Sequence, residues 1–273
     1  MGKFDGILIC TDLDGTALKK DKTVSEENLR AIEYFKSEGG YFTFVTGRMP
    51  YYSHDAARML VPNAPVGCVN GGGLYDFDSG KYIWTAPMPE GVQSLIRTID
   101  ENFPDVGIQV STFDKTYFAK ESKVMEWFRT VTRVPYAQRD YNDITEPIGK
   151  VLFGSDDEEE LLAIERTLRS HPMADGFEFV RSAKQLFEIL PYGITKGVSI
   201  LRLAEHLGLD IKRTVAVGDY NNDIPMFRTA GVGVAVANAC PAAKEAADYI
   251  TVSNEEHAIA NVIYDLESGK ISL

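Results

Sequence analysis

The hydrophobic pattern of the first third of the chain predicts strands and helices in alternation. Apolar runs with the length of a buried strand lie at 7–10, 41–46 and 66–69. Between the first two runs, Leu29, Ile32 and Phe35 recur at the spacing of one helix face. A strand, a helix and a second strand in this order predict a βαβ unit, in which the two strands lie parallel.

The ends of this helix have sequence signals of their own. Thr23 stands three residues before Glu26, the spacing of a capping box, and this predicts that Thr23 caps the helix. Gly39 and Gly40 follow the last apolar position, where glycine commonly ends a helix.

The last third of the chain repeats the strand and helix pattern. Ile200, Leu203 and Leu207 lie on one face of a predicted helix that ends near Gly208. Apolar runs of strand length follow at 214–219, 231–236 and 248–252. We expect these runs to add further parallel strands to the same sheet.

The middle of the chain has a different period. The segments 100–121 and 176–191 alternate apolar and polar positions, which is typical of antiparallel strands with one solvated face. Helical patterns lie near 121–131 and 157–170. The middle therefore predicts an α+β arrangement, in contrast to the two ends.

Together these patterns predict an α/β fold with a doubly wound, mostly parallel sheet and an inserted domain. The core would be discontinuous and would comprise 1–83 and 188–273, with the α+β insertion at 84–187.

The composition is that of an acidic, folded protein. The 273 residues are 44% hydrophobic, and a formal charge of −12 argues against nucleic acid or an anionic membrane as a partner. Cys10, Cys68 and Cys240 lie too far apart for a disulfide framework or a zinc motif. The first residues lack the pattern of a signal peptide, and no apolar run approaches the roughly 18 residues of a membrane helix. We expect a cytoplasmic protein.

Two aspartates, Asp12 and Asp14, directly follow the first apolar run in the sequence DLDGT at 12–16. Ligands of open parallel sheets bind beyond the carboxyl ends of the strands. Aspartate and glycine also form ordinary turns after strands, so the segment alone fits a turn as well as an active site. A calcium loop of the EF-hand type does not fit, because Ala17 and Thr23 stand where its glycine and glutamate belong.

Polar residues at the ends of other predicted elements favour a site. These residues are Thr46, Gly47, Arg48, Lys196, Asp219, Asn222 and Asp223. Clustered carboxylates repel one another unless a hard cation lies among them, and oxygen ligands of this kind suit Mg²⁺. The hydroxyl, backbone N–H and ammonium donors among them could hold a phosphate.

Each aspartate of the pair then has a task. Asp12 can attack phosphorus and form an aspartyl-phosphate. Asp14, two residues further along an extended segment, lies on roughly the same side, where it can protonate the leaving oxygen and later activate water. The pKa of an ordinary aspartate is about 3.9, so this task requires surroundings that favour the neutral form of Asp14.

Four motifs in order carry a family resemblance. They are DLDGT at 12–16, TGR at 46–48, ITKG at 194–197 and GDYNND at 218–223. With them the chain resembles the haloacid dehalogenase superfamily of phosphohydrolases. The segments 69–76 and 238–251 are similar to those of its Cof-type members, class IIB. The resemblance implies a catalytic core and a large α/β cap, inserted between the second and third motifs, that selects the substrate.

The resemblance also implies a role for each matching residue. Asp12 would be the nucleophile and a Mg²⁺ ligand, Asp14 the general acid and base with a metal-binding backbone carbonyl, and Asp219 a further metal ligand. Leu13, Thr46, Gly47, Lys196 and Asn222 would bind the phosphate. Thr16 and Asp223 would support these groups from behind, with Asp223 holding Lys196 or the water shell of the metal.

Two further residues have two interpretations each. Arg48 could contact the substrate or form a structural ion pair, and Asn70 could contact the substrate or shape the turn that follows it.

The function expected from this sequence is a Mg²⁺-dependent phosphatase for small phosphorylated metabolites, above all sugar phosphates. A phosphomutase and a non-catalytic protein that binds phosphorylated metabolites are the alternatives. No oligomeric state is predicted.

Overall fold

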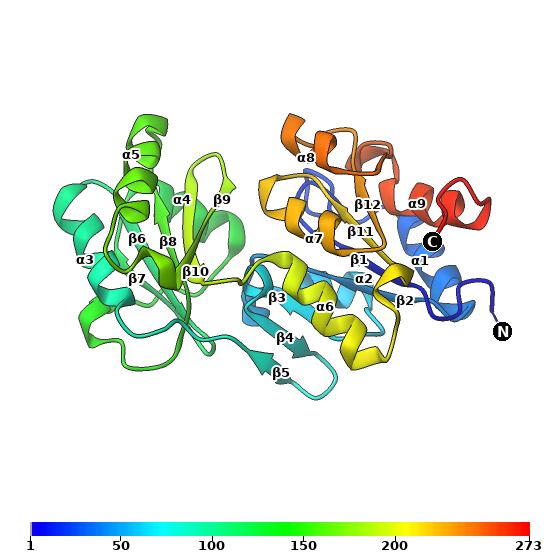
Figure 1. Cartoon of the computed structure of the whole chain (residues 1–273), viewed down its shortest axis with the longest axis horizontal. Coiled ribbons are helices and arrows are strands. Elements are labelled where there is room, and N and C mark those ends of the chain that lie inside the picture. The colour runs from blue at the N-terminus through cyan, green and yellow to red at the C-terminus, as the bar shows by residue number, and fades with distance from the viewer. Residues whose placement is uncertain (1) are drawn as a thin grey trace. The chain divides into compact units, whose positions relative to one another are not determined.

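The computed structural model describes residues 2–273 and divides them into two compact units (Figure 1). Unit 1 takes the described residues up to Arg48 together with Ser53–Trp84 and Thr195–Leu273. Unit 2 takes Met49–Tyr52 and Thr85–Ile194. Within the described residues, no helix is long and apolar enough to cross a membrane.

Unit 1 is built on a five-stranded parallel sheet with the strand order β13-β12-β11-β1-β2. Its strands are β1 (Leu8–Thr11), β2 (Tyr41–Phe44), β11 (Thr214–Gly218), β12 (Val232–Ala235) and β13 (Tyr249–Ile250). In the centre of the sheet, Ile9 lies opposite Phe42 on one side and Val215 on the other. The predicted parallel α/β sheet is confirmed.

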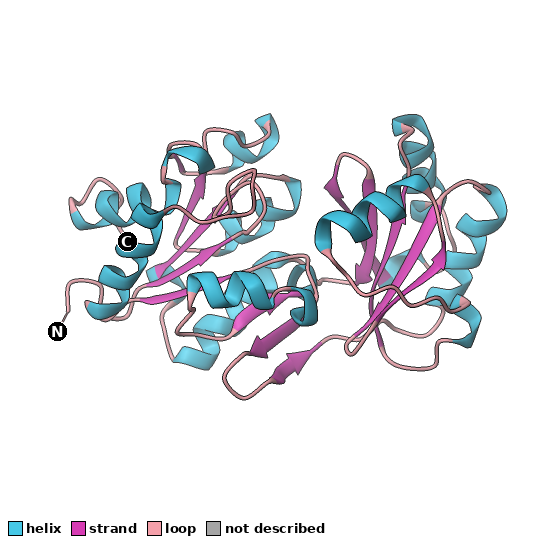
Figure 2. Cartoon of the chain, turned by 180° about the vertical axis from the view of Figure 1, so that it is seen from behind, coloured by secondary structure: helices cyan, strands magenta, loops and turns pink. Residues whose placement is uncertain are grey.

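The helices of unit 1 cover both faces of this sheet (Figure 2). They are α1 (Glu26–Ser37), α2 (His54–Leu60), α6 (Lys196–Leu207), α7 (Ile224–Thr229), α8 (Pro241–Ala246) and α9 (Ala258–Glu267). α1 packs against α9, and α6 packs against α7. α6 ends where predicted, because Gly208 follows with a φ of +66°, a left-handed conformation that favours glycine.

The start of α1 differs from the prediction. The capping residue is Ser25, whose Oγ accepts a hydrogen bond from the backbone N–H of Asn28 at 3.2 Å. The hydroxyl of Thr23 instead donates to Asp21 Oδ1 at 2.6 Å. The prediction of Thr23 as the cap was therefore wrong, because Asp21 binds its side chain in a local turn that precedes the helix.

A smaller three-stranded sheet follows α2 along the chain. It has the order β3-β4-β5 and comprises β3 (Val66–Cys68), β4 (Gly73–Asp76) and β5 (Lys81–Thr85). β3 pairs antiparallel with β4, and a parallel bridge between Val45 and Gly67 joins it to the chain that follows β2. The strand predicted at 66–69 exists, but it belongs to this second sheet.

Unit 2 contains an antiparallel sheet with the order β7-β6-β8-β10-β9. Its strands are β6 (Gly107–Thr112), β7 (Thr116–Lys120), β8 (Ile148–Gly154), β9 (Phe177–Ala183) and β10 (Leu186–Pro191), and its helices are α3 (Val92–Asn102), α4 (Lys123–Thr132) and α5 (Glu158–Arg169). The period-two segments form β6, β7, β9 and β10, as predicted. The sequence analysis missed β8 because its apolar residues Val151, Leu152 and Phe153 are consecutive and show no alternation with polar positions.

Sequence analysis also missed α3, although the spacing of Val92, Leu95, Ile96 and Ile99 is helical. The predicted end of the insertion at 187 lies inside β10, which continues to Pro191, and unit 2 itself continues to Ile194. The segment Met49–Tyr52 also belongs to unit 2.

Candidate active site

Neighbouring strands of the parallel sheet bring the predicted site residues together at their carboxyl ends. Asp12 follows β1 directly, and its backbone N–H donates to Val217 O of β11 at 2.8 Å. Asp219 follows β11, and Thr46 follows β2 on the other side of β1. Because the strands are parallel, these three ends lie along one edge of the sheet.

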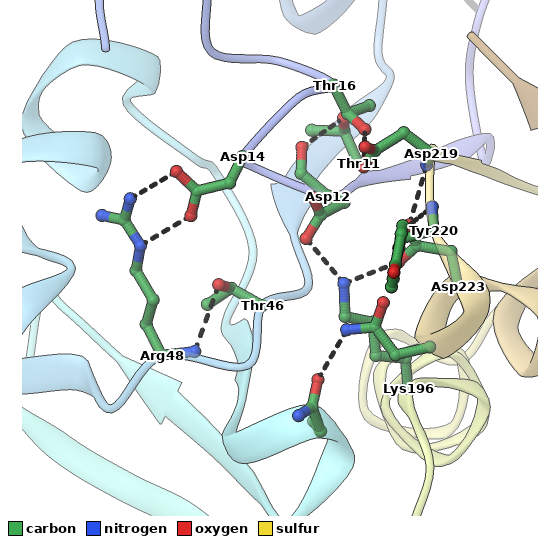
Figure 3. A network of polar contacts seen from close by, with 12 residues as sticks. Thr11, Asp12, Asp14, Thr16, Thr46, Arg48, Lys196, Asp219, Tyr220 and Asp223 are labelled. Carbon is green, nitrogen blue, oxygen red and sulfur yellow. Dashed lines mark hydrogen bonds and ion pairs between the residues drawn. The ribbon is translucent and has the colours of Figure 1, made fainter. Parts of the chain in front are cut away.

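Lys196 joins two of the aspartates. Its Nζ donates to Asp12 Oδ1 and to Asp223 Oδ1, each at 2.6 Å, and its side chain is 1% exposed (Figure 3). Asp223 Oδ2 accepts from the backbone N–H groups of Asp219 at 2.8 Å and of Tyr220 at 2.9 Å. Both oxygens of Asp223 are therefore engaged, and its side chain fixes Lys196 and the start of the following turn.

Three carboxylates of this site are close enough to share a cation. Asp12, Asp219 and Asp223 each offer an oxygen, and the three oxygens lie within 4.8 Å of one another. Thr16 Oγ1 donates to Asp219 Oδ1 at 3.0 Å and orients that carboxylate. Three carboxylates with one ammonium leave an excess of negative charge, so this donor set fits a hard divalent cation such as Mg²⁺.

The electrostatics of the site show the same excess. Burial raises the pKa of Asp12, and the carboxylates of Asp223 and Asp14 add to this effect against the opposing influence of Lys196. Burial also raises the pKa of Asp219, with further increases from Asp12 and Asp223. A cation bound among these groups would favour their ionised forms.

Asp14 turns away from this cluster (Figure 3). Arg48 donates to it through two nitrogens, from Nε to Oδ2 at 2.9 Å and from Nη2 to Oδ1 at 2.7 Å. Lys22 Nζ also donates to Oδ1, at 2.7 Å. Desolvation raises the pKa of Asp14, but Arg48 and Lys22 outweigh it, so the net pKa lies below its ordinary value. These surroundings favour the ionised form, whereas acid catalysis needs the neutral one.

Both residues with two interpretations have partners in unit 1. Arg48 forms the ion pair with Asp14. Asn70 Oδ1 accepts from Asn222 Nδ2 at 3.1 Å, and Asn70 also has a positive φ of +51° in the turn after β3. The structure thus brings Asn70 and Asn222 together. It also pairs Arg48 with Asp14, the residue that sequence analysis assigned to proton transfer.

The remaining predicted phosphate contacts surround these groups. Thr46 Oγ1 accepts from the backbone N–H of Arg48 at 3.2 Å. At Gly47, a Cβ would lie 2.9 Å from Asn70 Oδ1, so a larger residue there would displace the Asn70 side chain. Leu13 is fully buried, and its carbonyl accepts from the backbone N–H of Leu18 at 2.8 Å, which closes the loop that presents Asp12 and Asp14.

Sequence reasoning missed three residues that shape the site. Lys22 pairs with Asp14, and Asn238 Nδ2 donates to Gly15 O at 2.7 Å. Gly15 has a φ of +84°, and a Cβ there would lie 2.5 Å from Asp219 Oδ2. Of the three, only Gly15 has a sequence signal, since a glycine directly after the aspartates that follow a strand often marks a left-handed turn.

Comparisons with known proteins agree over nearly the whole chain. A model of the haloacid dehalogenase-like hydrolases matches residues 9–263. The 5-amino-6-(5-phospho-D-ribitylamino)uracil phosphatase YitU of Bacillus subtilis is 31% identical over 264 residues, which cover 94% of this chain and 96% of the relative.

Solved structures share the fold. A haloacid dehalogenase-like hydrolase from Bacteroides thetaiotaomicron has a TM-score of 0.83 and 26% identity, covering 95% of this chain and 99% of the other. The HAD subclass IIB sugar phosphatase BT4131 also has a TM-score of 0.83, with 20% identity, and covers 97% of this chain and 100% of its own. The second likeness concerns the fold alone.

Proposed function

The chain belongs to the haloacid dehalogenase-like hydrolases, and from this we propose that it is a Mg²⁺-dependent phosphatase that hydrolyses small organic phosphomonoesters through an aspartyl-phosphate. The observation that carries the proposal is the buried Asp12 at the end of β1, bonded to Lys196 and close to Asp219. This combination offers a nucleophile, a cation for the phosphate and a place for a metal.

In the first step an oxygen of Asp12 attacks phosphorus while the ester P–O bond breaks. Lys196 donates a hydrogen bond to Asp12 Oδ1, and this fixes the direction of the carboxylate. Its ammonium group also offsets negative charge on the phosphate. The leaving oxygen takes a proton from Asp14, so the product departs as a neutral alcohol and no alkoxide forms.

In the second step Asp14, now ionised, takes a proton from water as the water oxygen attacks phosphorus. The bond between phosphorus and Asp12 breaks, orthophosphate leaves, and Asp14 is protonated again. Thr46, Gly47, Asn222 and the backbone at Leu13 would hold the phosphate oxygens during both steps.

The metal would be held by the carboxylates of Asp12 and Asp219 and by the backbone carbonyl of Asp14. Mg²⁺ bound there supplies positive charge to the phosphate oxygens. Asp223 would stay behind this group, because its two oxygens already bind Lys196 and two backbone N–H groups.

We propose sugar phosphates and similar polyhydroxylated phosphates as the substrate class, with unit 2 as the cap that selects among them. The name of the relative YitU describes a ribityl phosphate substrate. The acidic composition supports a small phosphorylated metabolite as partner, without nucleic acid or membrane. The three scattered cysteines fit the reducing cytoplasm, which we propose as the location.

The test is phosphate release from a panel of sugar phosphates, nucleotides and an aryl phosphate, with Mg²⁺ and with chelator. We expect release that requires Mg²⁺ and that falls by at least about a thousandfold in Asp12→Asn, because amide nitrogen and oxygen are poor nucleophiles. The surface variant Arg30→Gln serves as control. Full turnover in Asp12→Asn would contradict the aspartyl-phosphate, and transfer of phosphate within the sugar without release would indicate a phosphomutase.

A further inference from the structure

Asp14 is held in one orientation by cations on both of its oxygens. Arg48 contacts both oxygens and Lys22 contacts Oδ1. The side chain of Arg48 is 18% exposed, while that of Lys22 is 47% exposed. The more buried, two-point contact of Arg48 therefore defines the direction of the carboxylate.

This direction does not suit the task proposed for Asp14. The carboxylates of Asp12 and Asp14 diverge, with Asp12 facing Lys196 and Asp14 facing Arg48 (Figure 3). If the proposed function holds, Asp14 must present one oxygen to the leaving group. A rotation that achieves this breaks the bonds of Oδ1 to Arg48 Nη2 and Lys22 and keeps the bond of Oδ2 to Arg48 Nε as a pivot.

Arg48 stands where the chain passes from one unit to the other. It is the last residue of unit 1 before Met49–Tyr52, which belongs to unit 2. Met49 is fully buried, and the hydroxyl of Tyr51 lies 2.6 Å from Thr116 Oγ1 of β7. A change in the orientation of the units would therefore act on the backbone torsions between Arg48 and Met49.

On the other side, the backbone of Arg48 is tied to unit 1. Its N–H donates to Thr46 Oγ1, and its carbonyl accepts from the N–H of Val69 at 3.1 Å. Val69 has a φ of +57°, which is unfavourable for a branched side chain and is maintained by its surroundings. The hydrogen bond that anchors the carbonyl of Arg48 thus comes from a residue in an unfavourable backbone conformation.

We propose that Arg48 is a positioning residue for Asp14, which holds the carboxylate in a resting direction and aims it at the leaving group when the Arg48–Met49 junction moves. Arg48 acts through Asp14 and needs no contact with the substrate. The Arg48–Met49 junction places Arg48 directly before Met49–Tyr52, the segment that belongs to unit 2.

The test compares Arg48→Gln with wild type on an alkyl phosphate and on an aryl phosphate. An alkyl leaving group needs protonation, whereas a nitrophenyl group leaves readily without it. We expect kcat on the alkyl phosphate to fall by about tenfold, with KM and the aryl reaction little changed. A poorly oriented Asp14 slows proton transfer to the leaving group, and only the alkyl reaction depends on that transfer. In an Asp14→Asn background, Arg48→Gln should cause no further loss.

Two further variants keep the proposal testable if Arg48→Gln folds poorly. Arg48→Lys retains the charge but offers a single point of contact, and we expect an alkyl-specific loss of about threefold. Tyr51→Phe removes the hydroxyl that lies within hydrogen-bond distance of Thr116 Oγ1, and we expect an alkyl-specific loss of kcat smaller than that of Arg48→Lys. In the Arg48→Lys background, Tyr51→Phe should cause no further loss. Tyr141→Phe, which removes another hydroxyl of unit 2, is the matched control.

Equal losses on both phosphates, or losses that add to that of Asp14→Asn, would overturn the positioning role of Arg48. Activity that survives Asp12→Asn would instead overturn the proposed function itself, so the two failures are distinguishable.

Discussion

Each unit of the molecule contains a buried lysine that is paired with carboxylate oxygens. In unit 1, Lys196 Nζ lies 2.6 Å from one oxygen of Asp12 and 2.6 Å from one oxygen of Asp223. In unit 2, Lys150 Nζ of β8 lies 3.3 Å from both oxygens of Glu188 of β10, and both side chains are 3% exposed. Burial and pairing are therefore common to both sites.

The two sites differ in the balance of charge. Lys196 faces two carboxylates with Asp219 close by, and in the described part of the chain no other group of three acidic, histidine or cysteine side chains comes within 4.8 Å. Lys150 and Glu188 carry one charge each, and Ser182 Oγ donates to Glu188 at 2.6 Å. A buried ion pair is thus weak support for a functional site, whereas an uncompensated group of carboxylates is strong support for a cation site.

Replacing each lysine by methionine should separate the two sites most clearly. We expect Lys196→Met to lower kcat by about 10²–10³, because the phosphate loses its cation and Asp12 loses its partner. Lys150→Met should leave turnover of an aryl phosphate little changed but lower the free energy of unfolding by about 3–5 kcal/mol, since Glu188 stays buried without this ammonium. Steady-state kinetics and urea unfolding measure the two effects.

The double variant Lys150→Met/Glu188→Gln sharpens this comparison. Removing both charges should restore much of the stability lost in Lys150→Met, because a neutral amide costs less to bury than a lone carboxylate. If Lys150→Met and Lys196→Met lost turnover equally, the distinction between a structural and a functional pair would be wrong.

The difference between the sites was partly predictable from the sequence. Asp12, Lys196 and Asp219 lie at the ends of predicted strands or helices, so topology alone brings them together. The contacts of Asp14 were not predictable, because they depend on the side-chain directions of Arg48 and Lys22 in loops.

The same limit applies to the fold. The parallel strands of unit 1 and the alternating strands β6 and β9 have periodic patterns, and both were predicted. β8 lies at the centre of its sheet, and its consecutive apolar residues Val151, Leu152 and Phe153 show no period of two. The cap of α1 was misplaced because Thr23 and Ser25 are both suitable residues, and only the bond from Thr23 to Asp21 decides between them.

The excess of carboxylates predicts how the stability of the metal-free protein changes with pH. The pKa of Asp12 is raised to about 7 and that of Asp219 to about 8, whereas an unfolded aspartate titrates near 3.9. Between these values the folded state binds more protons than the unfolded state. The free energy of unfolding in EDTA should therefore fall as pH rises from about 4 to 8, by up to about 1.4 kcal/mol per pH unit for each carboxyl.

Under the proposed function, Mg²⁺ should oppose this fall, because it would bind the ionised carboxylates of the folded state. Urea unfolding at several pH values, with Mg²⁺ and with EDTA, measures the effect. Asp219→Asn should reduce the slope in EDTA, while Asp265→Asn on the distant helix α9 should not. A stability in EDTA that rises through this range in wild type and Asp219→Asn alike would contradict the raised pKa values.

The smallest expected effect concerns two glycines of unit 1 with left-handed φ angles. At Gly15 (φ +84°) a Cβ would lie 2.5 Å from Asp219 Oδ2, whereas at Gly208 (φ +66°) it would meet no described atom within 4 Å. Both alanine variants should lose about 1 kcal/mol of unfolding free energy through backbone strain. Only Gly15→Ala should also raise the Mg²⁺ concentration for half-maximal turnover, by about tenfold, because it would displace Asp219, a carboxylate proposed to hold the metal. An equal Mg²⁺ requirement in both variants would show that the position of Asp219 does not limit metal binding.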